Sequence, residues 1–109
     1  MKLLVAIVQD ADAAGLAKAL GKSGHSATKL ASTGSFLREG NTTFIIGIED
    51  QDLLEVRAII AEHCRSRTRL LTPSVPLSQA PDPFLAQPVE VQVGGAVVFI
   101  LQAEDFFRV

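Results

Sequence analysis

The chain has 109 residues, of which 48% are hydrophobic and 20% charged, and this composition is typical of one globular domain. Its formal net charge is -2, which argues against binding to nucleic-acid polymers, because that function normally needs a basic surface. It contains no Trp or Tyr and only six Phe, so bases of a single strand would find little aromatic surface for stacking.

The chain opens with an apolar run over residues 2–8, KLLVAIV, which predicts a strand that is central in a sheet or covered on both faces. The run is too short for the core of a signal peptide and far below the ~20 apolar residues that span a membrane. The single cysteine, Cys64, cannot form an intrachain disulfide. We therefore expect a cytoplasmic protein without a membrane partner.

A helix is predicted after this strand, with Asp10 or Asp12 as its N-terminal cap and Gly24 as its terminator. Apolar residues recur there at helical spacing and define one buried face. The residues of this face are Ala13, Leu16, Ala17 and Leu20.

Two further strands are expected, over about residues 26–32 and from Thr42 to Ile48, because β-branched residues are dense there. A loop over about residues 33–41 separates them. Acidic residues then mark the start of a second helix, where negative charge suits the helix dipole. They are Glu49, Asp50 and Asp52, and the apolar face that follows consists of Leu53, Val56, Ile60 and His63.

All five prolines fall between Pro73 and Pro88, and the segment from about Arg65 to Gln87 shows neither helical nor strand periodicity. We expect a long loop, and loops beyond ~12–15 residues are often functional. The last strand has two parts, an alternating one over residues 89–93 and a buried one over residues 96–101. Gly94-Gly95 separates them as a bulge or bend. The tail, 102–109, is expected to form one helical turn.

The resulting order, β-α-β-β-α-β, predicts an α+β fold of the ferredoxin-like type, with a four-stranded antiparallel sheet and two helices on one face. The strands over residues 2–8 and 96–101 are apolar at adjacent positions, so both faces of the sheet need to be buried. A chain of this length has nothing left to cover the second face. We therefore expect copies of the chain to pack sheet against sheet, in a ring or a dimer.

Residue patterns for catalysis are weak. Adjacent side chains on a helix point about 100° apart, which argues against a metal site at His63-Cys64. Asp10 and Asp12 are better explained as helix caps than as a pair of catalytic acids. Because no nucleophile, base and orienting group converge in the pattern, we expect no enzymatic activity, no cofactor and no bound metal.

The loop between the second and third strands has the residues that a nucleotide site needs. Gly34 and Gly40 allow close approach of the backbone to a ligand, and Asn41 can donate to and accept from the edge of a purine. Phe36 and Leu37 can flank a base. Hydroxyl groups come from Thr28, Thr33 and Ser35. The alternative is a surface hairpin in which Phe36 and Leu37 pack on a neighbouring subunit, and composition alone leaves both interpretations open.

Three segments together resemble a known family. They are TKLASTGSFLREGNTTF at 28–44, AIVQDAD at 6–12 and PVEVQVGGAVVF at 88–99. In this order, and over essentially the whole chain, they resemble the PII-like cyclic di-AMP receptor family. The resemblance implies one ferredoxin-like domain over residues 1–109, assembled as a homotrimer that binds one cyclic di-AMP in each cleft between subunits.

The resemblance further implies that each cleft lies between a T-loop, about residues 33–41, and a long Pro-rich B-loop, about residues 66–88. Asn41 and Thr28 would hydrogen-bond adenine, Phe36 and Leu37 would pack on the base, and Ser35 and Gly47 would line the cleft. The neighbouring subunit would contribute residues near its C-terminus. Binding would reorder both loops and signal to an unidentified downstream protein.

The chain departs from the family pattern at two positions that concern the ligand phosphate. Members often carry Arg two residues before the motif Thr, where this chain has Ser26, and often carry Gln as the penultimate residue, where it has Arg108. Loss of a charge-assisted hydrogen bond costs about 1.5–3 kcal/mol, and Arg108 is a candidate to restore the cation. The alternatives are a PII-like sensor of another adenine nucleotide and a structural trimer without a ligand.

Overall fold

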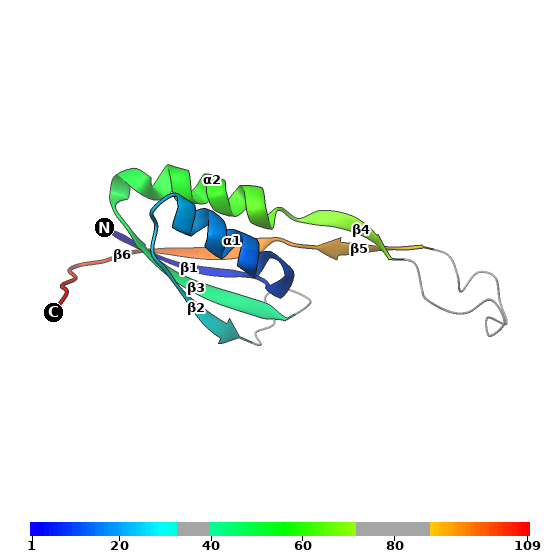
Figure 1. Cartoon of the computed structure of the whole chain (residues 1–109), viewed down its shortest axis with the longest axis horizontal. Helices are drawn as coiled ribbons and strands as arrows, with labels where there is room; N and C mark the ends of the chain where they lie inside the picture. The colour runs from blue at the N-terminus through cyan, green and yellow to red at the C-terminus, as the bar shows by residue number, and fades with distance from the viewer. Residues whose placement is uncertain (33–39, 72–87) are drawn as a thin grey trace.

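The computed structural model describes residues 1–32, 40–71 and 88–109. Within these ranges a four-stranded antiparallel sheet carries two helices on one face, and a two-stranded ribbon projects beyond this body (Figure 1). The sheet consists of β1 (Lys2–Gln9), β2 (Ala27–Ser32), β3 (Asn41–Ile48) and β6 (Ala96–Gln102). The helices are α1 (Asp10–Lys22) and α2 (Leu53–Cys64), and the ribbon is β4 (Arg67–Leu71) with β5 (Val89–Val93). A short 3-10 turn, Asp50–Asp52, precedes α2.

The strand order in the sheet is β2-β3-β1-β6, so β1 pairs antiparallel with a neighbour on each side. This central position explains why residues 2–8 form a nearly continuous apolar run. The order and the placement of both helices on one face confirm the predicted α+β, ferredoxin-like fold. No helix in the described ranges is long and apolar enough to cross a membrane.

The hydrophobic core lies between the sheet and the helices. Successive side chains of a strand point to opposite faces, and every second residue of β1 and β3 is therefore buried under the helices. Phe44 is 1% exposed, and the predicted helical face of α1 supplies Leu16 and Leu20. The remaining main core residues are Leu4, Ala6, Val8, Ile46, Val56, Ile60 and Cys64. Cys64, rather than the predicted His63, thus completes the buried face of α2.

The opposite face of the sheet is apolar and is not covered by the helices. The prediction that residues 96–101 are buried is wrong for the single chain, in which Phe99 is 47% and Leu101 48% exposed. The reason is that β6 is an edge strand and that these two side chains point away from the helices. The same face carries Leu3, Val5, Leu30, Ile45 and Val97.

The two acidic residues at the start of α1 are not caps. Gln9 occupies the cap position, and no side chain caps this helix end. Asp10 and Asp12 lie inside the first turn, and their carboxylates accept hydrogen bonds from Thr42 and Arg67 of other elements. Their negative charge still suits the N-terminal end of the helix dipole. At the other end Gly24 has a φ of 80° and terminates α1, as predicted.

The predicted long loop from Arg65 to Gln87 contains a strand. Arg67–Leu71 forms β4 and pairs with β5 in the register Arg67↔Val93 to Leu71↔Val89. Because both faces of this ribbon are largely open to solvent, β4 shows no apolar alternation by which it could be recognised. Gly94 and Gly95, with φ of 79° and 93°, form the predicted bend between β5 and β6. Residues 103–109 are irregular, so the helical turn predicted for the tail is absent.

Candidate functional site

A cavity of about 590 Å³ lies at one end of the sheet, where the start of β1, the start of β2 and the end of β3 meet the C-terminal segment. Antiparallel pairing produces this meeting point. Thr28 pairs with Ile45 and Leu3 with Gly47, while Lys2 pairs with Gln102 at the end of β6. The chain beyond β6 therefore leaves the sheet beside the start of β1.

Four of the residues predicted to bind ligand line this cavity. They are Ser26, Thr28, Gly47 and Arg108, and they come from three separate parts of the sequence. All four are exposed to solvent in the single chain. The fold thus collects a hydroxyl pair, an open backbone position and a guanidinium around one hollow.

Gly47 leaves space in the cavity that the protein itself does not use. A Cβ built on this residue would meet no atom within 4 Å, and its φ is not in the left-handed region. Neither backbone geometry nor packing within the chain therefore requires glycine at this position. The open space lies where a flat group could approach the backbone of β3.

The charges around the cavity are mixed, because both the cations Lys2 and Arg108 and the carboxylates of Glu49, Asp52 and Asp105 line it. Lys2 donates a hydrogen bond from Nζ to Gln102, and His25 Nε2 lies 3.3 Å from Glu55 Oε2. Arg108 has no ion pair with any residue in the described ranges. Its guanidinium is therefore available to an anionic group at the cavity.

Sequence reasoning missed the other residues that line the cavity, among them Lys2 and Phe106. Phe106 is 57% exposed and offers an aromatic ring to the cavity. The only signal for it in the sequence was the aromatic pair Phe106-Phe107 in the tail. Lys2 gave no signal, because it reaches the cavity only through the pairing of β1 with its neighbours.

Asn41 lies at the other end of β3 and does not line the cavity. It is 2% exposed and pairs with Gln9 and Ser32 in the sheet. One chain by itself therefore does not bring Asn41 together with the four cavity residues. The other predicted site residues, Gly34, Ser35, Phe36 and Leu37, lie outside the described residues.

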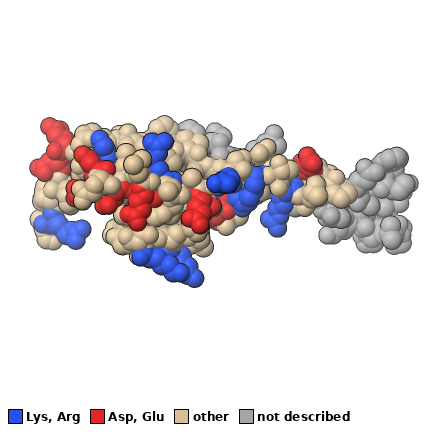
Figure 2. All heavy atoms as spheres, turned by 90° about the horizontal axis from the view of Figure 1, so that it is seen from above, with Lys and Arg blue, Asp and Glu red and all other residues tan. Residues whose placement is uncertain are grey.

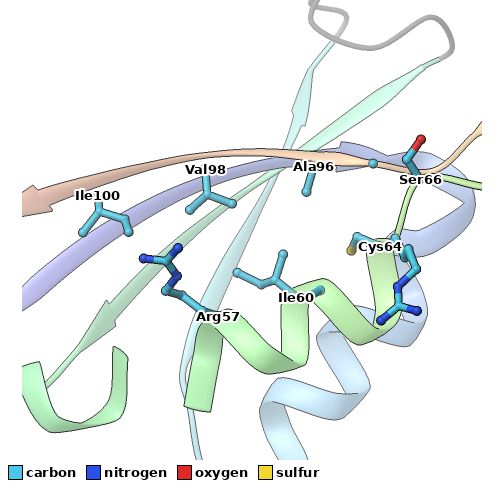
Figure 3. Close-up of a pocket in the computed structure, with 10 residues that line it drawn as sticks. Arg57, Ile60, Cys64, Ser66, Ala96, Val98 and Ile100 are labelled. Atoms are coloured by element: carbon cyan, nitrogen blue, oxygen red, sulfur yellow. The ribbon is translucent and has the colours of Figure 1, made fainter. Parts of the chain in front are cut away.

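A second cavity, of about 490 Å³, lies between α2 and β6 (Figure 3). Ile60 of α2 faces Val98 and Ala96 across it, with Arg57 beside them. Cys64 also lines it, and burial raises the pKa of this thiol to about 11. The thiol is therefore protonated at neutral pH and a poor nucleophile. None of the predicted ligand residues lines this second cavity.

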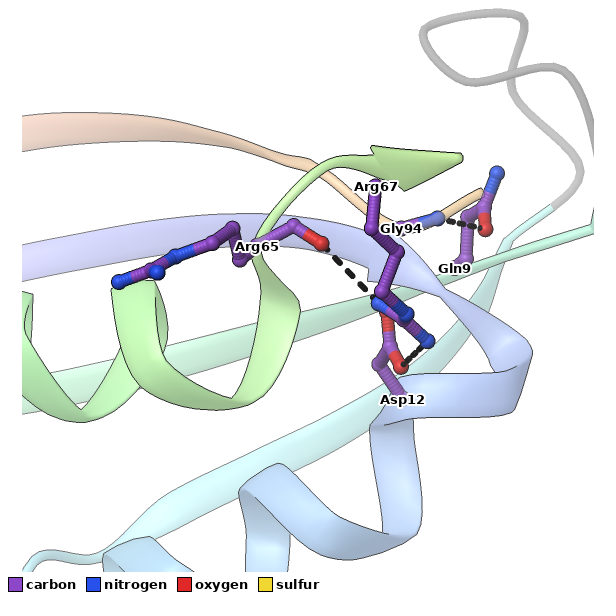
Figure 4. Close-up of polar contacts among 5 residues, drawn as sticks. All are labelled: Gln9, Asp12, Arg65, Arg67 and Gly94. Atoms are coloured by element: carbon purple, nitrogen blue, oxygen red, sulfur yellow. Dashed lines mark hydrogen bonds and ion pairs between the residues drawn. The ribbon is translucent and has the colours of Figure 1, made fainter. Parts of the chain in front are cut away.

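Polar contacts gather where the β4–β5 ribbon joins the body (Figure 4). Arg67 Nη2 donates to Asp12 Oδ1 at 3.0 Å, and the pKa of Arg67 is raised by this hydrogen bond and by the charge of Asp12. The amide of Gly94 donates to Gln9 Oε1 at 2.5 Å.

Seen from above, basic side chains gather towards the ribbon, whereas acidic and basic side chains alternate over the body (Figure 2).

The whole chain, residues 1–109, matches the family model described as cyclic-di-AMP receptor. The chain belongs to this receptor family. The resemblance read from segments 6–12, 28–44 and 88–99 is thereby confirmed. The chain is also similar, at 42% sequence identity and a TM-score of 0.80, to a crystal structure from Pediococcus pentosaceus ATCC 25745 whose protein is described as functionally unknown. The match covers 99% of this chain and 96% of that chain.

Metal ligands do not gather in the parts of the chain that the structure describes, since no three His, Cys, Asp or Glu side chains lie close enough to hold an ion. The polar groups at the larger cavity include hydroxyls, the guanidinium of Arg108, the ammonium of Lys2 and three carboxylates. The hydroxyls and the two cations are suited to hydrogen bonding and to charge neutralisation of a nucleotide.

Proposed function

We propose that this chain is a cytoplasmic, non-enzymatic receptor that binds cyclic di-AMP in clefts between the subunits of a homotrimer. The observation that carries the proposal is the cavity that collects Ser26, Thr28, Gly47 and Arg108 in a chain that matches the receptor family over its whole length. Its volume of about 590 Å³ falls in the range of small-molecule sites, which is roughly 300–1,000 Å³.

The chemistry of the cavity suits a purine dinucleotide. The Thr28 hydroxyl can hydrogen-bond an adenine edge, and the open backbone at Gly47 allows the flat base to approach β3. Arg108 supplies a charge-assisted contact to phosphate, which offsets the missing cation at Ser26. Phe106 at the rim can stack on a base.

The uncovered sheet face supports assembly. Phe99 and Leu101 are about half exposed on a face that also carries Leu3, Val5 and Ile45. A contiguous apolar face of this kind is typical of a protein–protein interface. Packing three such faces together would complete each cleft with residues of a neighbouring subunit, including Asn41 and the T-loop residues 33–41.

In this proposal the bound dinucleotide reorders the T-loop and the B-loop, residues 66–88, and so alters the surface offered to a downstream protein.

Calorimetric titration tests the proposal. We expect micromolar cyclic di-AMP to bind the wild-type protein with one site per chain, more tightly than ATP, ADP or AMP. The variant Thr28→Val keeps the shape and removes the hydroxyl, and we expect it to weaken binding about 2- to 10-fold. Ser23→Ala removes an exposed hydroxyl at the C-terminal cap of α1, outside the cavity lining, and is the control that should bind as wild type. No heat and no thermal shift with cyclic di-AMP would exclude the proposed ligand.

A sensor of another adenine nucleotide is the second candidate, and Ser26 favours it, because this position lacks the expected cation. Tighter binding of a mononucleotide than of cyclic di-AMP in the same titration would support this second candidate. A trimer that binds none of the four nucleotides would indicate a structural role. Long incubation of cyclic di-AMP with the protein and divalent metal should leave the ligand intact, whereas hydrolysis would contradict a receptor without catalytic activity.

A further inference from the structure

The turn from β1 into α1 makes polar contacts with the start of β3. The Thr42 hydroxyl donates to Asp10 Oδ1 at 2.6 Å, and the amide of Asp10 donates to the carbonyl of Gly40 at 2.9 Å. These two bonds hold the residues on either side of Asn41. Asp10 thus fixes the backbone position from which the Asn41 side chain projects.

The same turn also makes polar contacts with both strands of the β4–β5 ribbon. Asp12 accepts from Arg67 Nη2 at 3.0 Å and from Nη1 at 3.4 Å, at the first residue of β4 (Figure 4). Gln9 accepts from the amide of Gly94, directly after β5. Within residues 9–12, Asp10 therefore contacts the start of β3, while Gln9 and Asp12 contact the base of the ribbon.

One partner of each contact is shielded from solvent. The exposed fraction is 5% for Gln9, 8% for Asp12 and 4% for Thr42, whereas Asp10 and Arg67 are exposed. A buried polar group that loses its partner keeps the cost of leaving water and gains nothing in return. Loss of a contact would therefore leave a buried polar group of Gln9, Asp12 or Thr42 without its partner.

Two glycines permit the close approach that the contacts need. A Cβ on Gly40 would lie 2.5 Å from Asp10 Oδ2. A Cβ on Gly94 would lie 2.5 Å from the carbonyl of Arg65, and the φ of Gly94 is 79°. At both ends the backbone thus comes closer to the polar groups than a residue with a side chain allows.

We propose that Gln9, Asp10 and Asp12 form a polar brace that couples the position of Asn41 to the seating of the β4–β5 ribbon on the body. Asp10 and Asp12 are positioning residues, since neither lines the cavity of about 590 Å³. The consequence for ligand rests on the proposed function: a dinucleotide held by Asn41 would be sensed at the ribbon base. The coupling is reciprocal, so displacement of the ribbon would change ligand affinity by the same factor.

Amide hydrogen exchange of the full chain without ligand tests the brace directly. The variant Thr42→Val removes the hydroxyl at the β3 end. We expect it to speed exchange of the Gly94 amide, at the ribbon end, by about 2- to 10-fold, as well as exchange of the Asp10 amide. In the reverse direction, Arg67→Lys should speed exchange of the Asp10 amide. Thr42→Ser retains the hydroxyl donor and should restore wild-type exchange at both ends.

The matched control is Asp50→Asn, which removes a carboxylate paired with the amino group of Met1 outside the brace. It should leave the Asp10 and Gly94 amides unchanged. If Thr42→Val and Arg67→Lys each speed exchange only at their own end, the contacts are independent and the proposal is overturned. General destabilisation is separated from coupling by the Thr42→Ser rescue and by amides of the core strand β1, which should stay protected.

Titration of Asp12→Asn with cyclic di-AMP separates this inference from the proposed function. We expect affinity about 2- to 10-fold below that of the wild type, although Asp12 does not line the cavity. Absence of binding by the wild type would overturn the proposed function and leave the exchange experiment to decide on the brace. Wild-type affinity in Asp12→Asn would overturn the predicted effect of the brace on ligand.

Discussion

Arg67 and Asp12 form an ion pair between the first residue of β4 and the first turn of α1, with Nη2 and Oδ1 3.0 Å apart and the partners 55 positions apart in the sequence. The pair is asymmetric, because the Asp12 side chain is 7% exposed and that of Arg67 is 48% exposed. The buried carboxylate therefore depends on the guanidinium more than the guanidinium depends on the carboxylate.

This asymmetry predicts which of two variants loses more free energy of unfolding. Arg67→Ala leaves Asp12 buried without its cation and should destabilise the fold more than Asp12→Asn, which removes the buried charge itself at a cost of about 1–3 kcal/mol. Adding Asp12→Asn to Arg67→Ala should recover part of the loss. Urea denaturation measures the free energies of unfolding, and Arg69→Ala, on the same strand, is the control. Equal effects of Arg67→Ala and Arg69→Ala would show that the pair contributes nothing.

The buried thiol of Cys64 predicts a stability change at alkaline pH. Its pKa is raised to about 11 by burial and, to a lesser degree, by the charge of Asp12, so the folded state holds the proton more tightly than the unfolded state. The stability from this group is fully present below the unfolded pKa of about 9 and is lost as pH rises through about 11.

The comparison of wild type with Cys64→Ala isolates this effect. Between pH 8 and about 11 the wild type should lose up to about 2–3 kcal/mol more stability than the variant, since one unit of pKa is about 1.4 kcal/mol. Guanidinium denaturation at a series of pH values measures it. Parallel curves for the two proteins would mean that the thiol titrates normally.

Gly94 should tolerate no side chain. Its φ is 79°, and a methyl group added there would crowd the Arg65 carbonyl, so Gly94→Ala should cost about 1–3 kcal/mol through strain and displaced contacts. Gly15→Ala, in the middle of α1, is the opposite case. Its Cβ would meet only His63 Nδ1, at an ordinary 3.8 Å, and the change should stabilise by about 0.5–1 kcal/mol. Thermal denaturation of both variants checks the two signs.

The position of Ser26 in the cavity leads to a prediction about ligand affinity. It lines the cavity, so Ser26→Arg would place a second cation near Arg108 and should tighten cyclic di-AMP binding about 10- to 100-fold at low salt. Ser23→Arg adds the same charge at the C-terminal cap of α1, away from the cavity lining, and should have little effect. Arg108→Ala should weaken binding by a similar factor. Wild-type affinity in Arg108→Ala would show that this residue does not replace the missing cation.

The uncovered sheet face predicts how assembly responds to mutation. Leu101→Asp places a charge at a half-exposed position of this face and should convert the proposed trimer to a monomer without unfolding the chain. Leu54→Asp, at a position of α2 that is 79% exposed, should leave the mass unchanged. Light scattering after size-exclusion chromatography gives the masses. A trimer in Leu101→Asp would place the interface elsewhere.

Elements with a local signal could be predicted from the sequence. The apolar runs of β1 and β3 and the helical spacing of Leu16 and Leu20 report burial directly, because the period of a strand or helix is fixed by its own geometry. Strand β4 has no such signal. Its partner, β5, begins 18 residues after Leu71 in the sequence, and solvent on both faces removes the alternation.

The same distinction between local and long-range information applies to the candidate site. Residue chemistry and family resemblance, both properties of the sequence, proposed five ligand residues that the structure describes. They are Ser26, Thr28, Asn41, Gly47 and Arg108. Their grouping could not be predicted in this way. The pairing of β2 with β3 and the exit of the tail beside β1 place four of them around one cavity, whereas Asn41 lies at the far end of its strand.

The sequence by itself therefore determined the order of the two helices and of the four strands in the main sheet, most of the core, the family and the types of residue available for a nucleotide. The tertiary structure alone decided which of these residues meet, and it assigned Asp10 and Asp12 to Thr42 and Arg67 rather than to capping. The physical reason is that periodicity and propensity act over a few neighbouring residues. Ion pairs and cavities depend instead on strand register and helix packing, which bring together groups far apart in the chain.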